Sequence, residues 1–193
     1  MAAVPNCAKM RSSPAMTEDV VLGNNGTLQN VIVYLKGDFS HFSFDPSDSS
    51  AKIDQNGCSY GPHVLALMTG QQLQVSNSDQ TTHNINAAPR RNARWNESQA
   101  AGASPFTEVF ARPEIGIPVK CNIHPWMKAY LSVFSNPYFQ VTRDDGSFKI
   151  DNVPPGTYTL AAWHELYGTK EQTITIAEKS AQNASFTFTD RDR

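Results

Sequence analysis

The stretch VKCNIHPWMKAYLSVF, residues 119–134, determines how the rest of this sequence is interpreted. A pattern typical of a β-strand breaks at Cys121 and resumes after Met127. Cys121, His124 and Met127 follow one another at intervals of three residues, so the loop between the two strands wraps around one point in space. A thiolate, an imidazole and a thioether are side chains that suit copper. The stretch therefore predicts part of a copper site.

A further ligand comes from a second stretch, SNSDQTTHNIN, residues 76–86, in which His83 follows the end of another predicted strand. Two histidines and a thiolate in one plane, with a long axial methionine, form the copper site of electron-transfer proteins. Structural zinc fits less well, because it prefers four Cys or His ligands and would leave Met127 unused. Since the protein would fill every ligand position, none stays open for a substrate, and we expect this protein not to be an enzyme.

Composition and charge exclude several functional classes. Of the 193 residues, 18% are charged and the formal net charge is −2, which does not indicate binding to nucleic acid or to a membrane surface. No apolar run approaches the roughly 20 residues of a membrane span. The first residues, MAAVPNCAKMRSSPAM, lack the pattern of a signal peptide. We still expect a periplasmic or extracellular protein, because three cysteines allow one disulfide and one thiol protected by a metal.

The chain as a whole shows β-strand patterns and little helical periodicity. Residues 28–37 (LQNVIVYLKG) alternate and are rich in β-formers, and residues 63–79 (HVLALMTGQQLQVSNSD) predict strand, turn, strand. Residues 92–114 are polar and rich in small residues, which predicts a loop with at most a short helical turn. We therefore expect an all-β protein with an antiparallel sandwich.

The sequence changes character after residue 135. Short strand patterns are separated there by Asp-Asp-Gly and Pro-Pro-Gly turns, which predicts a second, small β-sandwich. The predicted organisation is an N-terminal arm at residues 1–18, a copper-binding domain at residues 19–135 and a second β-domain at residues 136–193.

The pattern NSDQTTHN followed by CNIHPWM resembles the cupredoxin family, and its short Cys-x-x-His-x-x-Met loop is most similar to that of amicyanin. The resemblance covers residues 19–135 and implies a Greek-key β-sandwich with one type 1 copper ion. It also implies that Asn84 ties the two ligand loops together by hydrogen bonds. The implied copper ligands are three equatorial residues and one axial residue: His83, Cys121 and His124, and Met127.

The second domain resembles a different kind of module. Residues 145–165 (DGSFKIDNVPPGTYTLAAWHE) are similar to the carboxypeptidase regulatory-like, or prealbumin-like, β-sandwich. This resemblance implies a domain with no chemistry of its own. The two-domain arrangement looks like bacterial periplasmic proteins that are described as plastocyanin-like or methylamine-utilisation-like.

Two features outside the ligand set allow more than one interpretation. Cys58 and His63, in GCSYGPHVLA, could contribute additional metal ligands, or Cys58 could form a disulfide with Cys7 that anchors the N-terminal arm. Pro125 and Trp126 could form an apolar docking patch beside His124, or could simply pack the loop.

The function that follows is single-electron transfer between redox partners. We expect a c-type cytochrome or another oxidoreductase as partner, with the electron passing by outer-sphere transfer through the ring edge of His124. The alternatives are copper storage or trafficking, or a role as an accessory copper-binding subunit of a larger redox enzyme. The sequence has five histidines and two are already assigned to copper, so it offers little for an additional metal site.

Overall fold

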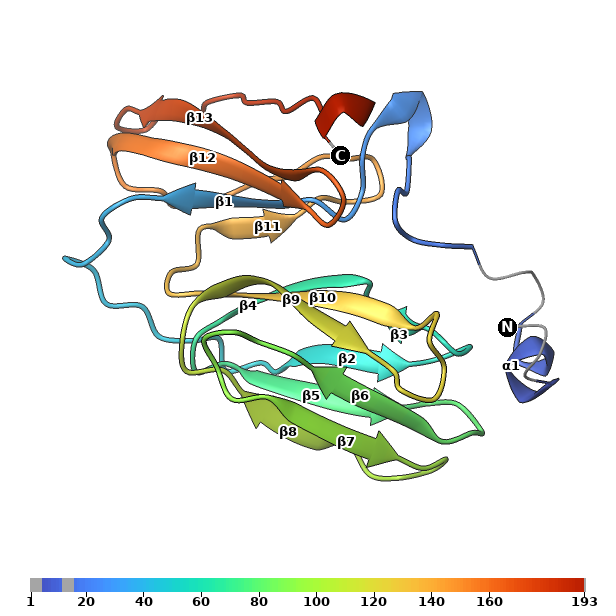
Figure 1. Ribbon diagram of the computed structural model, residues 1–193. Helices are drawn as coiled ribbons and strands as arrows, with labels where there is room; N and C mark the ends of the chain where they lie inside the picture. Colours follow the sequence, from blue (N-terminus) through green and yellow to red (C-terminus); the bar gives the residue numbers. More distant parts are fainter. Residues whose placement is uncertain (1–4, 12–15, 193) are drawn as a thin grey trace. The chain divides into compact units, whose positions relative to one another are not determined.

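The computed structural model describes residues 5–11 and 16–192, and its regular secondary structure is almost entirely β-strand (Figure 1). Among these residues, no helix is long and apolar enough to cross a membrane. The chain forms two compact units, and it passes between them more than once. The first unit contains Met1–Thr17 and Asp45–Ser135, and the second contains Glu18–Phe44 and Asn136–Arg193.

The first unit is the predicted β-sandwich, built from two sheets. One sheet has the order β4-β10-β9-β6-β7 and the other the order β3-β2-β5-β8. The pairs β4–β10 and β2–β5 are parallel, and the remaining pairs are antiparallel. The strands are β2 (Ala51–Gln55), β3 (Tyr60–Gly61), β4 (Val64–Met68), β5 (Gln72–Asn77), β6 (His83–Ala87), β7 (Trp95–Gln99), β8 (Phe106–Val109), β9 (Glu114–Lys120) and β10 (Lys128–Phe134).

Side chains from both sheets pack into one core. Ile53 and Val75 come from the four-stranded sheet, while Ile85, Val119 and Leu131 come from the five-stranded sheet, and all of them are 0% exposed. Burying such a side chain contributes about 1.5–3 kcal/mol relative to leaving it in water. The core therefore gives a rigid frame for the loops at its ends.

The strand register brings the two predicted ligand stretches together. β6 begins at His83, and its antiparallel neighbour β9 ends at Lys120, which pairs with Asn86. Cys121 follows directly, so it lies beside the beginning of β6. The chain then turns and returns as β10, which pairs with β9 from Lys128 onward.

The N-terminal arm of the first unit is attached to the turn between β2 and β3. The helix α1 (Pro5–Lys9) carries Cys7, which is bonded to Cys58 with a Cα–Cα distance of 5.6 Å. Arg11 adds hydrogen bonds from Nη1 to Gly57 O at 3.2 Å and to Ser59 Oγ at 2.8 Å. The arm is thus connected to this turn covalently and by polar contacts.

Residues 92–114 differ from the predicted loop, because they contain β7 and β8. Each of these strands lies at the edge of its sheet. Most side chains of β7 and β8 are exposed or half-buried, with Gln99 as the buried exception. Strands without a buried apolar row lack the alternation that sequence reasoning depends on.

The second unit corrects the predicted domain boundary. β1 (Ile32–Lys36), which was assigned with residues 19–135 to the copper-binding domain, lies in the second sheet, whose order is β11-β1-β12-β13. It pairs with β11 (Phe139–Val141) on one side and β12 (Gly156–His164) on the other. The apolar pattern identified a buried strand correctly, but such a pattern does not specify the sheet in which a strand is paired.

The second unit also contains one edge strand, two short turns and several coil segments. β13 (Gly168–Ile176) lies at the edge of the sheet, and short 3₁₀ turns occur at η1 (Asn24–Gly26) and η2 (Asp190–Asp192). Apolar side chains from coil segments pack against the buried residues of β1 and β12, and they include Phe148, Ile150, Val153, Ala184, Phe186 and Phe188. This unit therefore has a core of its own.

Candidate metal centre

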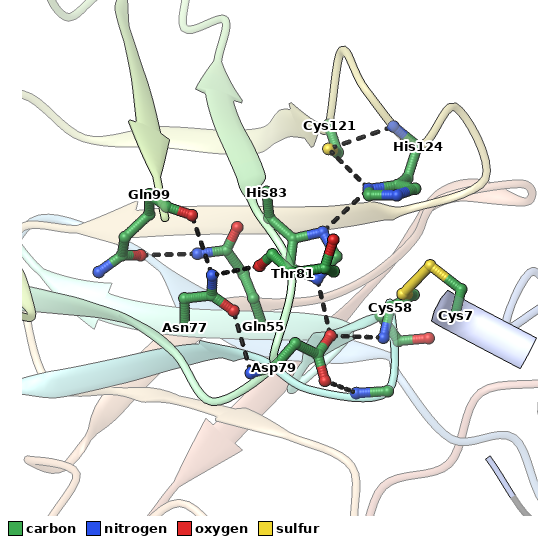
Figure 2. A network of polar contacts seen from close by, with 12 residues as sticks. Cys7, Gln55, Cys58, Asn77, Asp79, Thr81, His83, Gln99, Cys121 and His124 are labelled. Atoms are coloured by element: carbon green, nitrogen blue, oxygen red, sulfur yellow. Dashed lines mark hydrogen bonds and ion pairs between the residues drawn. A yellow bond between two sulfur atoms is a disulfide. The ribbon is translucent and has the colours of Figure 1, made fainter. Parts of the chain in front are cut away.

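His83, Cys121 and His124 come together in the first unit (Figure 2). One ligand atom from each residue lies within 4.8 Å of the others. His83 Nδ1 is 2.9 Å from His124 Nδ1, which is 3.8 Å from Cys121 Sγ. The three residues are 0%, 3% and 3% exposed, so the donor atoms lie in a buried site.

The donor set fits copper. Two nitrogens bound to one ion at about 2 Å in a trigonal plane lie about 3.5 Å apart. The 2.9 Å separation of His83 Nδ1 and His124 Nδ1 is a hydrogen-bond distance, so in the metal-free protein a proton joins the two rings. His83 Nδ1 and His124 Nδ1 would hold a metal ion only without a proton between them and about half an ångström further apart. One thiolate and two imidazoles are ligands of mixed softness that suit copper in both oxidation states.

The surroundings of Cys121 favour its thiolate. Burial by itself raises the pKa of the thiol, but hydrogen bonds from His83 and from backbone N–H groups, among them that of His124, outweigh burial. The His124 N–H lies 3.3 Å from Cys121 Sγ. The pKa of Cys121 is therefore lowered from its ordinary value, and the form that binds metal is stabilised before any metal arrives.

The two histidines differ in protonation. Burial lowers the pKa of His83, but its hydrogen bonds to Cys121 and Asp79 outweigh that effect, and the pKa is raised overall. The pKa of His124 is lowered, first by burial and then by the charge of His83. The two rings therefore shift in opposite directions, and a metal bound at His83 Nδ1 would compete with a proton there.

Met127 closes the ligand loop. Its backbone N–H donates to His124 O at 2.9 Å, and its carbonyl accepts from Cys121 N at 3.2 Å. The residue is 1% exposed and belongs to the core of the first unit. These bonds fix the loop from Cys121 to Met127, while the assignment of the thioether as axial ligand stays a prediction.

Asn84 links the two ligand stretches in the way that the resemblance implied. Its Oδ1 accepts a hydrogen bond from Asn122 N at 2.7 Å, and its Nδ2 donates to Asn96 Oδ1 at 2.5 Å. The side chain therefore joins β6 to the loop after β9 and also to β7.

The structure separates the alternatives left open for Cys58 and His63. The sulfur of Cys58 is bonded to Cys7, so it has no thiolate to offer a metal, although both sulfurs lie within 4.8 Å of a His124 ring nitrogen. His63 is buried, and its ring lies 5.9 Å from that of Tyr130. In the described part of the chain, His63 belongs to none of the clusters of potential metal ligands.

The predicted docking patch is only partly exposed. Pro125 is exposed, but Trp126 is half-buried and donates from Nε1 to Cys58 O at 3.1 Å. The Trp126 ring lies 5.2 Å from the ring of His124, which is 3% exposed. Ile123, in contrast, is 50% exposed. Trp126 therefore packs the loop, and the accessible apolar atoms next to His124 belong to Ile123 and Pro125.

Two residues of the site were not identified from the sequence. Tyr60, which is 2% exposed, donates from its hydroxyl to Asn84 O at 2.5 Å. Burial raises the pKa of Tyr60 strongly, and the neighbouring Cys121 raises it further, so the hydroxyl stays protonated. Asp79, within the stretch that identified His83, accepts a hydrogen bond from His83 Nε2 at 2.7 Å.

Comparisons with known proteins give low similarity. A family model described as polysaccharide lyase family 4, domain II, matches residues 129–184. This description differs from the predicted carboxypeptidase regulatory-like module, so the type of the second unit stays a prediction. No curated protein matches the chain.

Several solved structures match about half of the chain. A copper-containing nitrite reductase from Thermus scotoductus is 18% identical over 47% of this chain and 23% of its own, with a TM-score of 0.43. A purple cupredoxin from Nitrosopumilus maritimus is 21% identical over 44% of this chain and 99% of its own, with a TM-score of 0.37. An amicyanin variant with Cu(I) is 14% identical over 52% of this chain and 97% of its own, with a TM-score of 0.40.

Proposed function

We propose that this chain is a type 1 copper protein that carries single electrons between redox partners. The observation that supports the proposal is the buried cluster of His83, Cys121 and His124, whose ligand atoms lie within 4.8 Å of one another. This cluster has the mixture of one thiolate and two imidazoles that characterises electron-transfer copper sites.

The residues of the chain bind the metal and limit its rearrangement. Bound copper would supply a one-electron Cu(II)/Cu(I) couple. His83 is fixed by its place at the start of β6, and Cys121 and His124 are fixed by the hydrogen bonds of their loop. Burial keeps bulk water away from the donor atoms. Ligands held in this way change little between the two oxidation states, which favours fast electron transfer.

A partner would have little direct access to the ring edge of His124. His124 is 3% exposed, while Ile123 is 50% exposed and Pro125 is exposed as well. We therefore assign the docking surface to Ile123 and Pro125, from which an electron would reach His124 through the loop. The partners, a c-type cytochrome or another oxidoreductase, and an exported location belong to the same proposal.

The decisive experiment is an optical and EPR spectrum of the full chain loaded with Cu(II). We expect an intense visible band from thiolate-to-copper charge transfer and a narrow copper hyperfine splitting, both lost on addition of a mild reductant. Cys121→Ser should bind copper without the band. An ordinary tetragonal Cu(II) spectrum in the unmodified protein would refute the proposal, and a colourless protein that takes up several Cu(I) ions would indicate storage.

Reduction potentials, measured by redox titration of the same visible band, test the axial ligand. A thioether that binds weakly along the axis affects the relative stability of the two oxidation states more than copper binding itself. Met127→Leu should therefore keep copper and raise the reduction potential, while Met127→Gln should lower it, because an amide oxygen stabilises Cu(II). Equal potentials in all three proteins would show that Met127 is not a ligand.

A further inference from the structure

A buried carboxylate connects a proposed copper ligand to the disulfide-bonded turn. Asp79 is 4% exposed and accepts three hydrogen bonds (Figure 2). Its Oδ1 accepts from Gly57 N at 2.6 Å, and its Oδ2 accepts from Cys58 N at 2.8 Å and from His83 Nε2 at 2.7 Å. Both oxygens of the carboxylate are therefore in use, and one of them contacts the ring of His83.

The contact with His83 has a chemical consequence for metal binding. An imidazole that binds a metal through one ring nitrogen carries its proton on the other nitrogen, and an acceptor at that position fixes both the tautomer and the ring orientation. Asp79 is such an acceptor at Nε2. His83 Nδ1 is the nitrogen that faces His124, on the side of the proposed metal site.

Support for the turn alone does not explain this arrangement. The N–H groups of Gly57 and Cys58 need an acceptor because the turn is buried, and Asp79 satisfies them. A carboxylate that only accepted the hydrogen bonds of this turn would not need its further contact with His83 Nε2. The backbone of Asp79 is fixed in addition, since its N–H donates to Asn77 Oδ1 at 3.1 Å.

We propose that Asp79 is the positioning residue of the copper site, holding the Nε2 proton of His83 so that Nδ1 faces the metal. This inference rests on the proposed function and deepens it. A carboxylate partner also makes the imidazole a stronger donor, which favours Cu(II) over Cu(I). Asp79 Oδ2 also accepts a hydrogen bond from Cys58 N. The disulfide-bonded turn therefore helps to hold the carboxylate that contacts His83.

The first test uses the metal-free, unmodified protein. A long-range ¹H–¹⁵N correlation spectrum reports which ring nitrogen of each histidine carries a proton. We expect His83 Nε2 to be protonated and its proton to exchange slowly with water, because the contact is buried. A His83 ring without a proton at Nε2 would overturn the proposal, and this measurement needs neither copper nor a variant.

The second test compares variants loaded with copper. Both oxygens of Asp79 accept hydrogen bonds, whereas an asparagine side chain has only one acceptor oxygen. Asp79→Asn should therefore hold the His83 ring less well and lower the Cu(II) affinity by about 10- to 100-fold. Cu(I) affinity should fall less, so that the ratio of the two affinities shifts towards Cu(I). Asp79→Glu keeps the charge and should restore part of the Cu(II) affinity. Asp54→Asn is the matched control, because Asp54 accepts from Ser76 Oγ on β5 rather than from a ligand.

The outcomes distinguish this inference from the proposed function. If the unmodified protein lacks the thiolate-to-copper band, the proposed function fails, while the Nε2 measurement still decides whether Asp79 positions His83. If the band is present but Asp79→Asn binds both copper ions like Asp54→Asn, Asp79 is not a positioning residue. If Asp79→Asn does not fold, the ¹H–¹⁵N correlation spectrum of the unmodified protein decides alone whether Asp79 positions His83.

Discussion

His83 and His124 share one hydrogen bond, yet their surroundings affect protonation in opposite directions. Burial lowers the pKa of both rings. At His83 this effect is outweighed by hydrogen bonds to Cys121 and Asp79. His124 meets the charge of His83 instead, which lowers its pKa further. The surroundings therefore favour protonation of His83 over protonation of His124.

This difference predicts the titration of the metal-free protein. By NMR of the ring protons, His83 should titrate above the ordinary value of about 6.5 and His124 below it. The raised pKa of His83 contributes stability that is fully present below about pH 6.5 and is lost as the pH rises through its folded value. Copper bound at His83 Nδ1, as proposed, would compete with a proton at that nitrogen, so the apparent copper affinity should fall as the pH is lowered. Identical titration curves for the two rings would contradict the assignment.

The sequence indicated the proposed ligands but not the residues that contact them. Cys121, His124 and Met127 were singled out because a thiolate, an imidazole and a thioether at intervals of three residues suit copper. Asp79 lies four residues before His83 in a polar turn, where aspartate is common for reasons of turn formation alone. Its contact with the ring depends on a bend of the chain that only the folded sandwich provides.

At the scale of elements, burial decided which strands could be predicted. β4, β5 and β10 bury most of their apolar side chains and were predicted from their pattern. Pro118 in β9 favours an edge position or a bulge. β9 lies between β10 and β6, and its register against β10 shifts at an irregularity next to Pro118, between the pairs Leu131–Ile117 and Val133–Glu114. Its pairing with β6 ends at Val119, so Pro118 lies just beyond that ladder, and its carbonyl accepts from Ala88 N. A proline is tolerated in such a central strand where no partner needs its N–H.

The disulfide between Cys7 and Cys58 predicts a stability effect. The two cysteines are 51 residues apart in the sequence, and closing a loop of this length is worth about 4 kcal/mol in the chain-entropy model. Cys7→Ser should therefore lower the free energy of unfolding by up to about this amount, measured by urea denaturation. Cys58→Ser should behave alike, because it breaks the same bond.

The cysteine assignment has an independent control. Alkylation of the unfolded, unreduced and copper-free protein should modify one thiol, at Cys121, which is the free cysteine of the described chain. Three modified cysteines would contradict the disulfide. An unchanged denaturation curve for Cys7→Ser would show that the bond constrains neither the folded nor the unfolded state.

At the scale of the whole molecule, the course of the chain was the part that sequence reasoning could not predict. The composition changes after residue 135, where the chain passes from the first unit to the second. The chain also passes from the second unit to the first at residues 44–45, but the composition does not change there. β1 looks like any strand that is buried on both faces, and its partners β11 and β12 lie more than 100 residues further along the chain. Pairing at that distance is decided by the packing of the folded unit and not by local pattern.

This topology predicts that residues 136–193 do not fold alone. β1 is an interior strand of the second sheet, and its residues Ile32, Val33, Tyr34 and Leu35 are 0–7% exposed. At about 1.5–3 kcal/mol for each buried apolar side chain, the loss of this strand removes about as much as the total stability of a typical domain. The fragment should therefore lack cooperative unfolding by circular dichroism and show poorly dispersed NMR signals.

The matched control restores the missing strand. Residues 18–44 joined through a flexible Gly/Ser linker to residues 136–193 contain every strand of the second sheet and all residues of its core cluster. This fusion should unfold cooperatively, and replacing Val33 with Asp in it should abolish folding, because an unpaired charge would be buried between β11 and β12. Cooperative unfolding of residues 136–193 without β1 would show that the second unit does not need the strand, and that the boundary expected from the sequence was sufficient for folding.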